Sequence, residues 1–464
     1  MWHFLFKVCL LVVCFLQFAW FRPVQKQQTK AAPPNIIFIL ADDLGWSELG
    51  CYGNRFNETP HLDKMAQRGM LFKQAYAAAP VCSPTRAAFL TGQYPARVGI
   101  TDYLRPEESV HLSTNYITFP ELLQKNKYRT GIVGKWHLTG YAHAGAVEVG
   151  PNQHGFDETI LSENRGIAWG SYFHPYHFNL EIEQKLPGKE YLIDRCNVEA
   201  IEFIERNKKR PFFLYLSHYA VHTALAGKEE LVKKYEQKPG AGKGSLARKN
   251  NPHLAAQLEV IDEGVGMIVK KLEELELTEN TILIFTSDNG GESDWEKAVT
   301  TNAPLRGGKS TLYEGGIRVP LIIVWPGIIK GGSISNTPVI TTDFYPTLLQ
   351  MANTALDKNQ IVDGVSLIPL LKNPNATINR NTLYWHYPLK EKHFLGGRSS
   401  GAIREGDWKL IQFYDTGEAE LYNLENDMEE QKNLAAALPE KVQSLQRKLK
   451  DWQQKVVVQE NRKL

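Results

Sequence analysis

Five short apolar runs separate longer amphipathic stretches along the chain. They lie at residues 35–40, 130–134, 211–217, 281–286 and 319–325. Continuous apolar runs of this length are typical of parallel strands that are buried on both faces. Between them, apolar residues from Leu254 to Leu275 recur every three or four positions, which indicates a helix packed on a sheet. The alternation predicts an α/β fold with a large, mostly parallel but mixed sheet flanked by helices.

Further helices are expected at 60–68, 117–127, 191–207 and 342–351. After about residue 355 the pattern changes. Short strands are expected at 402–404, 408–413 and 420–422, followed by a polar helix at 439–456. We therefore predict a catalytic α/β domain over residues 31–355 and a smaller C-terminal α+β subdomain with an antiparallel sheet over 356–464.

The first 30 residues have the features of a leader. Lys7 precedes an apolar run over residues 8–21 that only Gln17 interrupts. This length matches the apolar region of a signal peptide and is short for a membrane span. We expect an exported protein (periplasmic, secreted or lysosome-like) with a signal peptide near residues 1–22, or an uncleaved anchor at 1–30. No stable membrane span is expected beyond the leader.

Composition narrows the function classes further. The 53 Lys and Arg nearly balance the 51 Asp and Glu, which argues against a nucleic-acid partner. Of the five cysteines, Cys51, Cys82 and Cys196 lie outside the leader. Three cysteines do not make a disulfide framework, and the sequence leaves open whether Cys51 and Cys196 pair. Of the three, Cys82 has the neighbourhood that suggests chemistry.

Polar residues directly follow four of the predicted strands. Ligands of open α/β sheets bind beyond the carboxyl ends of the strands, so these side chains are expected to share a site. Adjacent carboxylates are costly without a cation, and carboxylate and amide oxygens together suit calcium, whereas magnesium demands a stricter octahedron. The alternative to a metal site is that the Asp pair caps a helix and SDNGG forms a tight turn. In strand order, the residues are Asp42 and Asp43, Lys135 and His137, His218 and His222, and Asp288 and Asn289.

Basic groups nearby suit an anionic substrate. Lys135, Lys309 and Arg86 are candidates for neutralising a tetrahedral oxyanion, and His137 and His222 for moving protons. Both His218 and His222 follow the same strand. We prefer His222 to His218 because it lies further into the loop.

Residues 82–86 read CSPTR and are followed by AAFLTG. Pro84 suits a first helical turn, which places Cys82 at a helix N-terminus, where an anion is favoured. By itself, this pattern predicts a thiolate nucleophile whose pKa is lowered by the helix and Arg86. A cysteine-dependent phosphatase would have more than the three residues that separate Cys82 from Arg86 here.

CSPTR also resembles the C-x-P-x-R signature of formylglycine-dependent sulfatases, in the alkaline phosphatase superfamily. NIIFILADDLGW, GIVGKWHLTG, TSDNGG, PLRGGKSTLYEGGIRVP and TTDFYPTLL each resemble another block of that family, in family order. The match runs from about residue 34 into the C-terminal region. The motifs of this sequence are similar to those of the arylsulfatase A and N-acetylgalactosamine-6-sulfatase types.

The resemblance implies a sulfuric ester hydrolase in which a maturation enzyme oxidises Cys82 to formylglycine, with Pro84 and Arg86 in the recognition signal. The aldehyde would hydrate to a gem-diol. One diol oxygen would attack the ester sulfur, and the other hydroxyl would later lose its proton so that sulfate is expelled. The resemblance implies that calcium is held by Asp42, Asp43, residue 82, Asp288 and Asn289. Arg86 would support the diol, and His137 would deprotonate or hold its second hydroxyl. Lys135 and Lys309 would bind the sulfate, and His222, with or without Lys309, would protonate the leaving alcohol.

The substrate is less defined. Aromatic, histidine-rich segments at 169–178 and 384–393 fit either a pocket rim that stacks on sugars or packing between the domains. The resemblance favours a sulfated saccharide of galactose or N-acetylgalactosamine type, with an aryl sulfate as a surrogate. Two alternatives stay open, a formylglycine-dependent phosphodiesterase or phosphonate monoester hydrolase, and a catalytically inactive glycan-binding relative. The resemblance also implies a further polar contact to the sulfate near residues 161–164, to which no residue is assigned.

Overall fold

The structure is a computed structural model that describes residues 33–105, 108–140, 149–163, 171–179, 181–293 and 295–460. The leader at 1–30 lies outside these residues, as does part of the aromatic segment at 169–178. None of the helices formed by the described residues is both long and apolar enough to cross a membrane.

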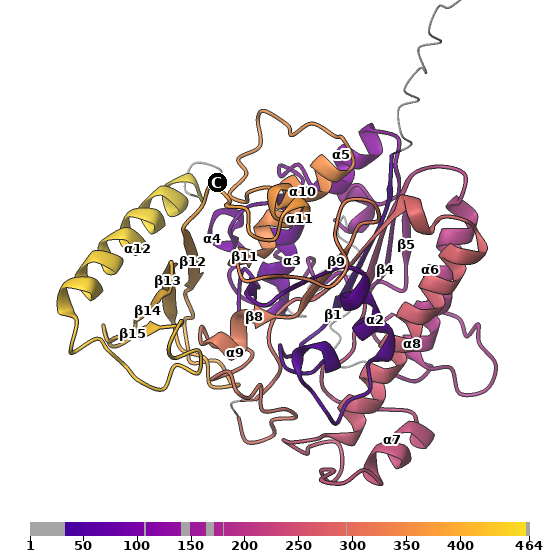
Figure 1. Cartoon of the computed structure of the whole chain (residues 1–464), viewed down its shortest axis with the longest axis horizontal. Helices are drawn as coiled ribbons and strands as arrows, with labels where there is room; N and C mark the ends of the chain where they lie inside the picture. The colour runs from indigo at the N-terminus through magenta and orange to yellow at the C-terminus, as the bar shows by residue number, and fades with distance from the viewer. Residues whose placement is uncertain are drawn as a thin grey trace, which may run out of the picture. The chain divides into compact units, whose positions relative to one another are not determined.

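A mixed sheet of eight described strands forms the centre of the fold, in the order β10-β2-β9-β7-β1-β6-β4-β5 (Figure 1). From β7 to β5 all neighbours are parallel, which confirms the predicted fold class. The strands are β1 (Asn35–Ala41), β2 (Met70–Phe72), β4 (Arg129–Gly134), β5 (Glu158–Ile160), β6 (Phe212–Ser217), β7 (Thr281–Ser287), β9 (Leu321–Val324) and β10 (Ser333–Ser335).

The run at 319–325 was predicted to be one parallel strand, and this is wrong. It is divided between β8 (Arg318–Val319) and β9, and β9 is antiparallel to both β7 and β2. Pro320 separates the two strands because proline has no N–H for the ladder. An apolar run that is buried on both faces carries no information about strand direction.

Two apolar layers cover the sheet. In β1, Ile36 and Phe38 face one core cluster, whereas Ile37 and Ile39 face the other. Helices α3, α5, α10 and α11 pack into the first cluster, and α2, α6 and α8 into the second. The predicted stripe lies on α8. The helices in chain order are α2 (Pro60–Arg68), α3 (Cys82–Thr91), α4 (Pro95–Val98), α5 (Phe119–Lys125), α6 (Leu192–Asn207), α7 (Glu229–Glu236), α8 (Pro252–Glu274), α9 (Glu314–Ile317), α10 (Phe344–Met351) and α11 (Ile368–Lys372).

The C-terminal region is an antiparallel sheet in the order β12-β13-β14-β15, with α12 (Pro439–Glu460) alongside it (Figure 1). Leu445 and Leu449 of α12 pack on this sheet. A short sheet of β11 (Val339–Ile340), β3 (Ala75–Tyr76) and β8 lies apart from the main sheet. The C-terminal strands are β12 (Thr382–Tyr387), β13 (Ser400–Glu405), β14 (Trp408–Phe413) and β15 (Ala419–Asn423), of which the sequence analysis missed β12.

The C-terminal sheet supports the start of α3. Trp385 on β12 donates its Nε1–H to the carbonyl oxygen of Ala77 at 2.8 Å. The same apolar cluster includes Val81, which directly precedes Cys82. Lys409 on β14 is fully buried and donates to Glu314 on α9 at 2.9 Å. The contacts of Trp385 and Val81 hold the segment that leads into Cys82, and the contact of Lys409 joins the C-terminal sheet to α9.

Candidate active site

Four neighbouring parallel strands end at one edge of the sheet. The register pairs Ala41 with Ser287, and it pairs Ser217 with both Leu40 and Gly134. The residues that follow β1, β4, β6 and β7 therefore lie together at this edge of the sheet, as the sequence pattern predicted.

Three carboxylates and one amide form the acidic half of the site. Asp42, Asp43, Asp288 and Asn289 are all buried. The Asn289 Nδ2 donates to Asp43 Oδ1 at 2.7 Å, and the backbone N–H of Asp43 donates to Asp288 Oδ1 at 3.2 Å. The two sequence-distant pairs thus interlock in one cluster.

The donor set of this cluster fits a divalent cation. The Asn289 Oδ1 is buried and has no hydrogen-bond partner among the described residues. Ligand atoms of Asp42, Asp43 and Cys82 all lie within 4.8 Å of one another. Several hard oxygens around an unpartnered amide oxygen match the preference of calcium.

Each carboxylate of the cluster is paired with one buried basic side chain. Burial acts to raise the pKa of Asp42, but the nearby positive charges, chiefly Lys135, outweigh burial and lower it. Three acids balanced by three bases become a net positive cluster once a divalent cation binds, and this favours an anionic ester. The shortest contacts are Lys135 Nζ to Asp42 Oδ2 at 2.6 Å, Lys309 Nζ to Asp43 Oδ2 at 2.7 Å and Arg86 Nη2 to Asp288 Oδ2 at 2.7 Å.

Cys82 is the first residue of α3, with its Sγ 3.6 Å from Asp42 Oδ1. Burial raises the pKa of this thiol, because it outweighs the opposing charges of Lys135 and Lys309. The prediction of a lowered thiol pKa is therefore wrong. Desolvation, together with the carboxylates of Asp42 and Asp288, opposes a thiolate at this position.

Arg86, one turn along α3, is clamped from several sides. Its Nε and Nη2 donate to Asp288, and its Nη1 donates to Ser217 Oγ at 2.6 Å and to the carbonyl of Lys135 at 3.1 Å. The guanidinium therefore ties α3 to the ends of β4, β6 and β7. Ser217, the last residue of β6, was not predicted as part of the site.

His137 presents one free ring nitrogen. Its Nε2 lies 3.0 Å from the carbonyl oxygen of Leu104. A carbonyl only accepts, so Nε2 carries the proton and Nδ1 keeps its lone pair. Nδ1 is buried and has no partner within the described part of the chain. Burial lowers the pKa of His137 well below its usual range, so the ring is neutral and Nδ1 is an available proton acceptor.

The segment at 161–164, where a sulfate contact was expected, contributes Glu163 to the site. Its carboxylate accepts the backbone N–H groups of Trp136 and His137. This contact orients the loop after β4. Tyr219 Oη also donates to Glu163 at 3.1 Å. Sequence reasoning missed Glu163 because its contacts to the loop are to backbone groups, which leave no signal in the side-chain pattern.

Of the two histidines after β6, the structure brings His222 to the cluster. Its Nε2 lies 3.1 Å from Lys309 Nζ and 3.6 Å from Asp43 Oδ2. Its Nδ1 lies 2.5 Å from the carbonyl of Thr223, so Nε2 accepts from Lys309. His218 is buried with neither ring nitrogen partnered among the described residues, and burial lowers its pKa to about 3.

Glu292 is a further member that the sequence analysis missed. Its Oε1 lies 3.6 Å from Lys309 Nζ and accepts from Thr223 Oγ1 at 3.0 Å. Ligand atoms of Asp43, His222 and Glu292 also lie within 4.8 Å of one another. Its position directly after SDNGG was the available signal.

In both aromatic segments, most of the aromatic residues that the structure describes pack within the protein. Tyr384 stacks on Trp452 with ring centroids 4.8 Å apart, and Trp385 and Tyr387 are buried. This part of 384–393 packs within the protein. Tyr172, Tyr176 and Phe178 of the other segment are also buried in the core.

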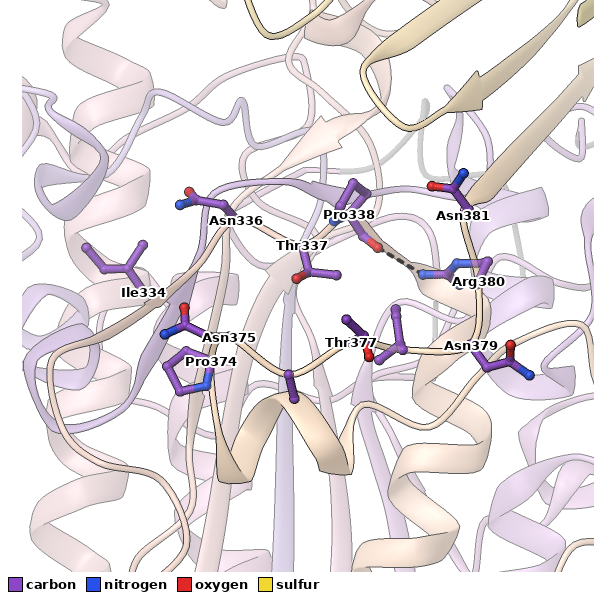
Figure 2. A pocket seen from close by; sticks show the side chains of 12 residues that line it. Ile334, Asn336, Thr337, Pro338, Pro374, Asn375, Thr377, Asn379, Arg380 and Asn381 are labelled. Atoms are coloured by element: carbon purple, nitrogen blue, oxygen red, sulfur yellow. Dashed lines mark hydrogen bonds between the residues drawn. The ribbon is translucent and has the colours of Figure 1, made fainter.

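Two other features lie apart from the cluster. Cys51 and Cys196 are free thiols. A cavity of about 810 Å³ lies between segments 334–338 and 374–381, where Arg380 donates to the carbonyl of Pro338 at 3.0 Å (Figure 2). None of the charged residues of the cluster lines it.

Comparison with known proteins shows the family of this chain. The Sulfatase family profile matches residues 34–354, and the profile of the N-sulphoglucosamine sulphohydrolase C-terminal region matches residues 308–459. Human steryl-sulfatase is 32% identical in an alignment 443 residues long. The match covers 77% of this chain and 72% of that protein. Human N-acetylgalactosamine-6-sulfatase is 34% identical over 368 residues, covering 73% of this chain and 66% of that protein.

Solved structures share the fold. The crystal structure of Ps i-CgsB in complex with k-i-k-neocarrahexaose has a TM-score of 0.79 at 30% identity and covers 91% of this chain and 93% of that one. The structure of BT4656 in complex with its substrate D-glucosamine-2-N,6-O-disulfate has a TM-score of 0.70 at 25% identity, covering 91% and 98%. The family profile covers more than half of the chain, so the chain belongs to the sulfatase family and is a sulfuric ester hydrolase.

Proposed function

We propose that this enzyme hydrolyses sulfate esters with a formylglycine made from Cys82 as its nucleophile. A maturation enzyme makes the formylglycine, and calcium is held by Asp42, Asp43, Asp288 and Asn289 together with residue 82. The observation that supports this most is the position of Cys82, which opens α3 with its Sγ 3.6 Å from Asp42 Oδ1 inside a ring of buried cations. A plain thiol with a raised pKa is a poor nucleophile there, whereas a hydrated aldehyde does not depend on forming a thiolate.

The basic residues have distinct roles in the proposed reaction. When bound, calcium makes a hydroxyl of the hydrated aldehyde more acidic and draws charge from a sulfate oxygen. Lys135 and Lys309 neutralise the sulfate group, and Arg86 fixes residue 82 against β7. Lys309 Nζ donates to His222 Nε2, and this hydrogen-bonded pair supplies the proton that the leaving alcohol takes up. The free Nδ1 of His137 accepts a proton from the hydroxyl that does not attack.

We infer a sulfated carbohydrate of galactose or N-acetylgalactosamine type as the natural substrate. N-acetylgalactosamine-6-sulfatase is among the relatives, and two structural neighbours were solved with saccharides. Residues 31–355 carry the catalytic groups in this proposal, and residues 356–464 form a subdomain that supports α3 and the site rim.

A comparison of matched sulfate and phosphate esters tests the proposed reaction. We expect kcat/KM for 4-nitrophenyl sulfate to exceed that for 4-nitrophenyl phosphate by at least about tenfold, because differential transition-state binding sets this ratio. A preference for the phosphate ester would support the phosphodiesterase or phosphonate hydrolase alternative instead. Modified protein that binds sulfated saccharide without releasing sulfate would support the inactive relative.

Asp288→Asn should weaken calcium binding by about 10- to 100-fold, because it removes a charged oxygen and releases Arg86 from its partner. The measurement is the rise in Tm with calcium concentration, since an ion that binds only the folded state stabilises it. Asp407→Asn, an exposed acid between β13 and β14, is the matched control. An unchanged calcium titration for Asp288→Asn would remove Asp288 from the ligand set.

A further inference from the structure

A tight turn over residues 393–397 lies beside Lys309. The backbone N–H of His393 donates to the carbonyl of Gly397 at 2.8 Å, and that of Gly396 donates back to His393 at 2.8 Å. Gly397 also donates its N–H to Ser310 Oγ at 3.2 Å. A Cβ at Gly397 would come within 1.9 Å of the Ser310 carbonyl oxygen, so glycine is needed for this approach. The turn is thus fixed on the residue that follows Lys309.

Aromatic side chains from three segments meet at this turn. The His393 ring lies edge-on to Tyr103 at 5.4 Å and stacks with Phe394 at 4.5 Å. Phe394 in turn lies 5.9 Å from Trp295, and 65% of its surface is exposed. The Arg105 guanidinium covers the Tyr103 ring at 4.4 Å. Tyr103 and Arg105 flank Leu104, whose carbonyl holds His137, so this rim adjoins the proton-transfer groups.

His393 carries a hydrogen-bond donor that is not used within the protein. The ring is only 6% exposed, and its Nδ1 accepts the backbone N–H of Leu395 at 3.1 Å. Burial, with the charges of Lys309 and Arg105, lowers the pKa of His393 to about 4, so the ring is neutral. The proton is therefore on Nε2, which is buried and has no partner among the described residues.

Trp295, which contacts Phe394, and Glu292, which contacts Lys309, also have unpartnered polar atoms. Trp295 Nε1 is a buried donor, and Glu292 Oε2 a buried acceptor, and neither has a partner in the described part of the chain. A buried polar group left without a hydrogen bond keeps its full desolvation cost, so a ligand that pairs it is favoured. An apolar alcohol, such as a sterol, would cover these groups and leave them unpaired. A sugar ring offers several hydroxyls that can both donate and accept.

We propose that His393 is a specificity-determining residue that selects sulfated sugars, its Nε2–H donating to an oxygen of the ring that carries the sulfate while Phe394 stacks on the sugar face. This inference rests on the proposed function, because it places the ester sulfate at Lys309. It goes beyond the proposed function because it names His393 as the residue that recognises the alcohol part of the substrate.

The test compares N-acetylgalactosamine 6-sulfate and galactose 6-sulfate with 4-nitrophenyl sulfate in wild type, His393→Leu and His393→Gln. For the better saccharide, His393→Leu should lower the ratio of its kcat/KM to that of the aryl ester by about 10- to 100-fold, because a lost hydrogen bond to a buried group discriminates by this much. His393→Gln keeps an N–H and should restore most of the ratio. His386→Leu, whose ring contacts Tyr414 instead of the rim, is the control and should leave the ratio unchanged.

Each other outcome counts against the proposal. An unchanged ratio in His393→Leu, equal impairment of both variants, or hydrolysis of the aryl ester alone by wild type would overturn it while the proposed function stands. Wild type that cleaves none of these sulfate esters would contradict the proposed function itself. If His393→Leu fails to fold, Phe394→Ala decides, since its exposed ring is not needed for the core. It should raise KM for the saccharide and leave that for the aryl ester nearly unaffected, and equal effects on both would overturn the proposal.

Discussion

Cys82→Ala is expected to abolish sulfate ester hydrolysis, with kcat lowered by at least about 10⁴-fold, because the covalent route needs a nucleophile at this position. The variant removes only the sulfur, at the start of a helix whose apolar contacts come from later residues such as Phe89 and Leu90. The protein should therefore stay folded. Steady-state release of 4-nitrophenol measures the activity, and thermal unfolding checks the fold.

Cys82→Ser is the matched control for this result. Serine has nearly the size of cysteine, but its hydroxyl has no second oxygen on the same carbon with which to expel sulfate. We expect this variant to release at most one equivalent of alcohol and then to stop as a covalent sulfate ester. Sustained turnover by either variant would contradict the proposed mechanism.

Lys309→Ala is expected to lower kcat/KM by about 10³-fold, because one side chain supplies two effects. Its Nζ lies 2.7 Å from Asp43 Oδ2 and 3.1 Å from His222 Nε2, between the acidic cluster and His222. Without it, the sulfate loses a buried positive charge and the leaving oxygen loses a proton source.

The leaving group separates these two effects. 4-Nitrophenolate leaves readily without a proton, whereas a sugar alkoxide does not. Lys309→Ala should therefore impair a sulfated saccharide more than 4-nitrophenyl sulfate. Equal losses on the two esters would contradict a role in protonation, and a loss below about threefold would contradict both roles. The exposed Lys330→Ala is the control and should behave as wild type.

Much of the acidic cluster could be predicted from the sequence. Asp42 and Asp43, and Asp288 and Asn289, follow directly on apolar runs, so the position of each pair depends only on where a strand ends. Parallel neighbours then bring the strand ends together. Loop geometry could not be predicted in this way. His222 rather than His218 contacts Lys309 because of the path that the chain takes after β6, which no periodicity records.

Other differences have the same origin in tertiary contacts. The direction of β9 depends on its neighbours, since a fully buried run looks alike in both directions. β12 was missed because its aromatic residues are equally typical of a binding surface. Burial is the main cause of the raised pKa of Cys82, and burial is a property of the folded chain. Glu163 binds backbone groups, so the side-chain pattern gave no indication of it.

The most direct test of the account is the mass of the tryptic peptide over residues 74–86 from protein of known specific activity. We predict the mass of an aldehyde at position 82, in a fraction that rises in proportion to activity across preparations. Protein made in a host that lacks the maturation enzyme should be folded, inactive and unmodified. Fully active protein that retains an ordinary thiol at Cys82 would contradict the account.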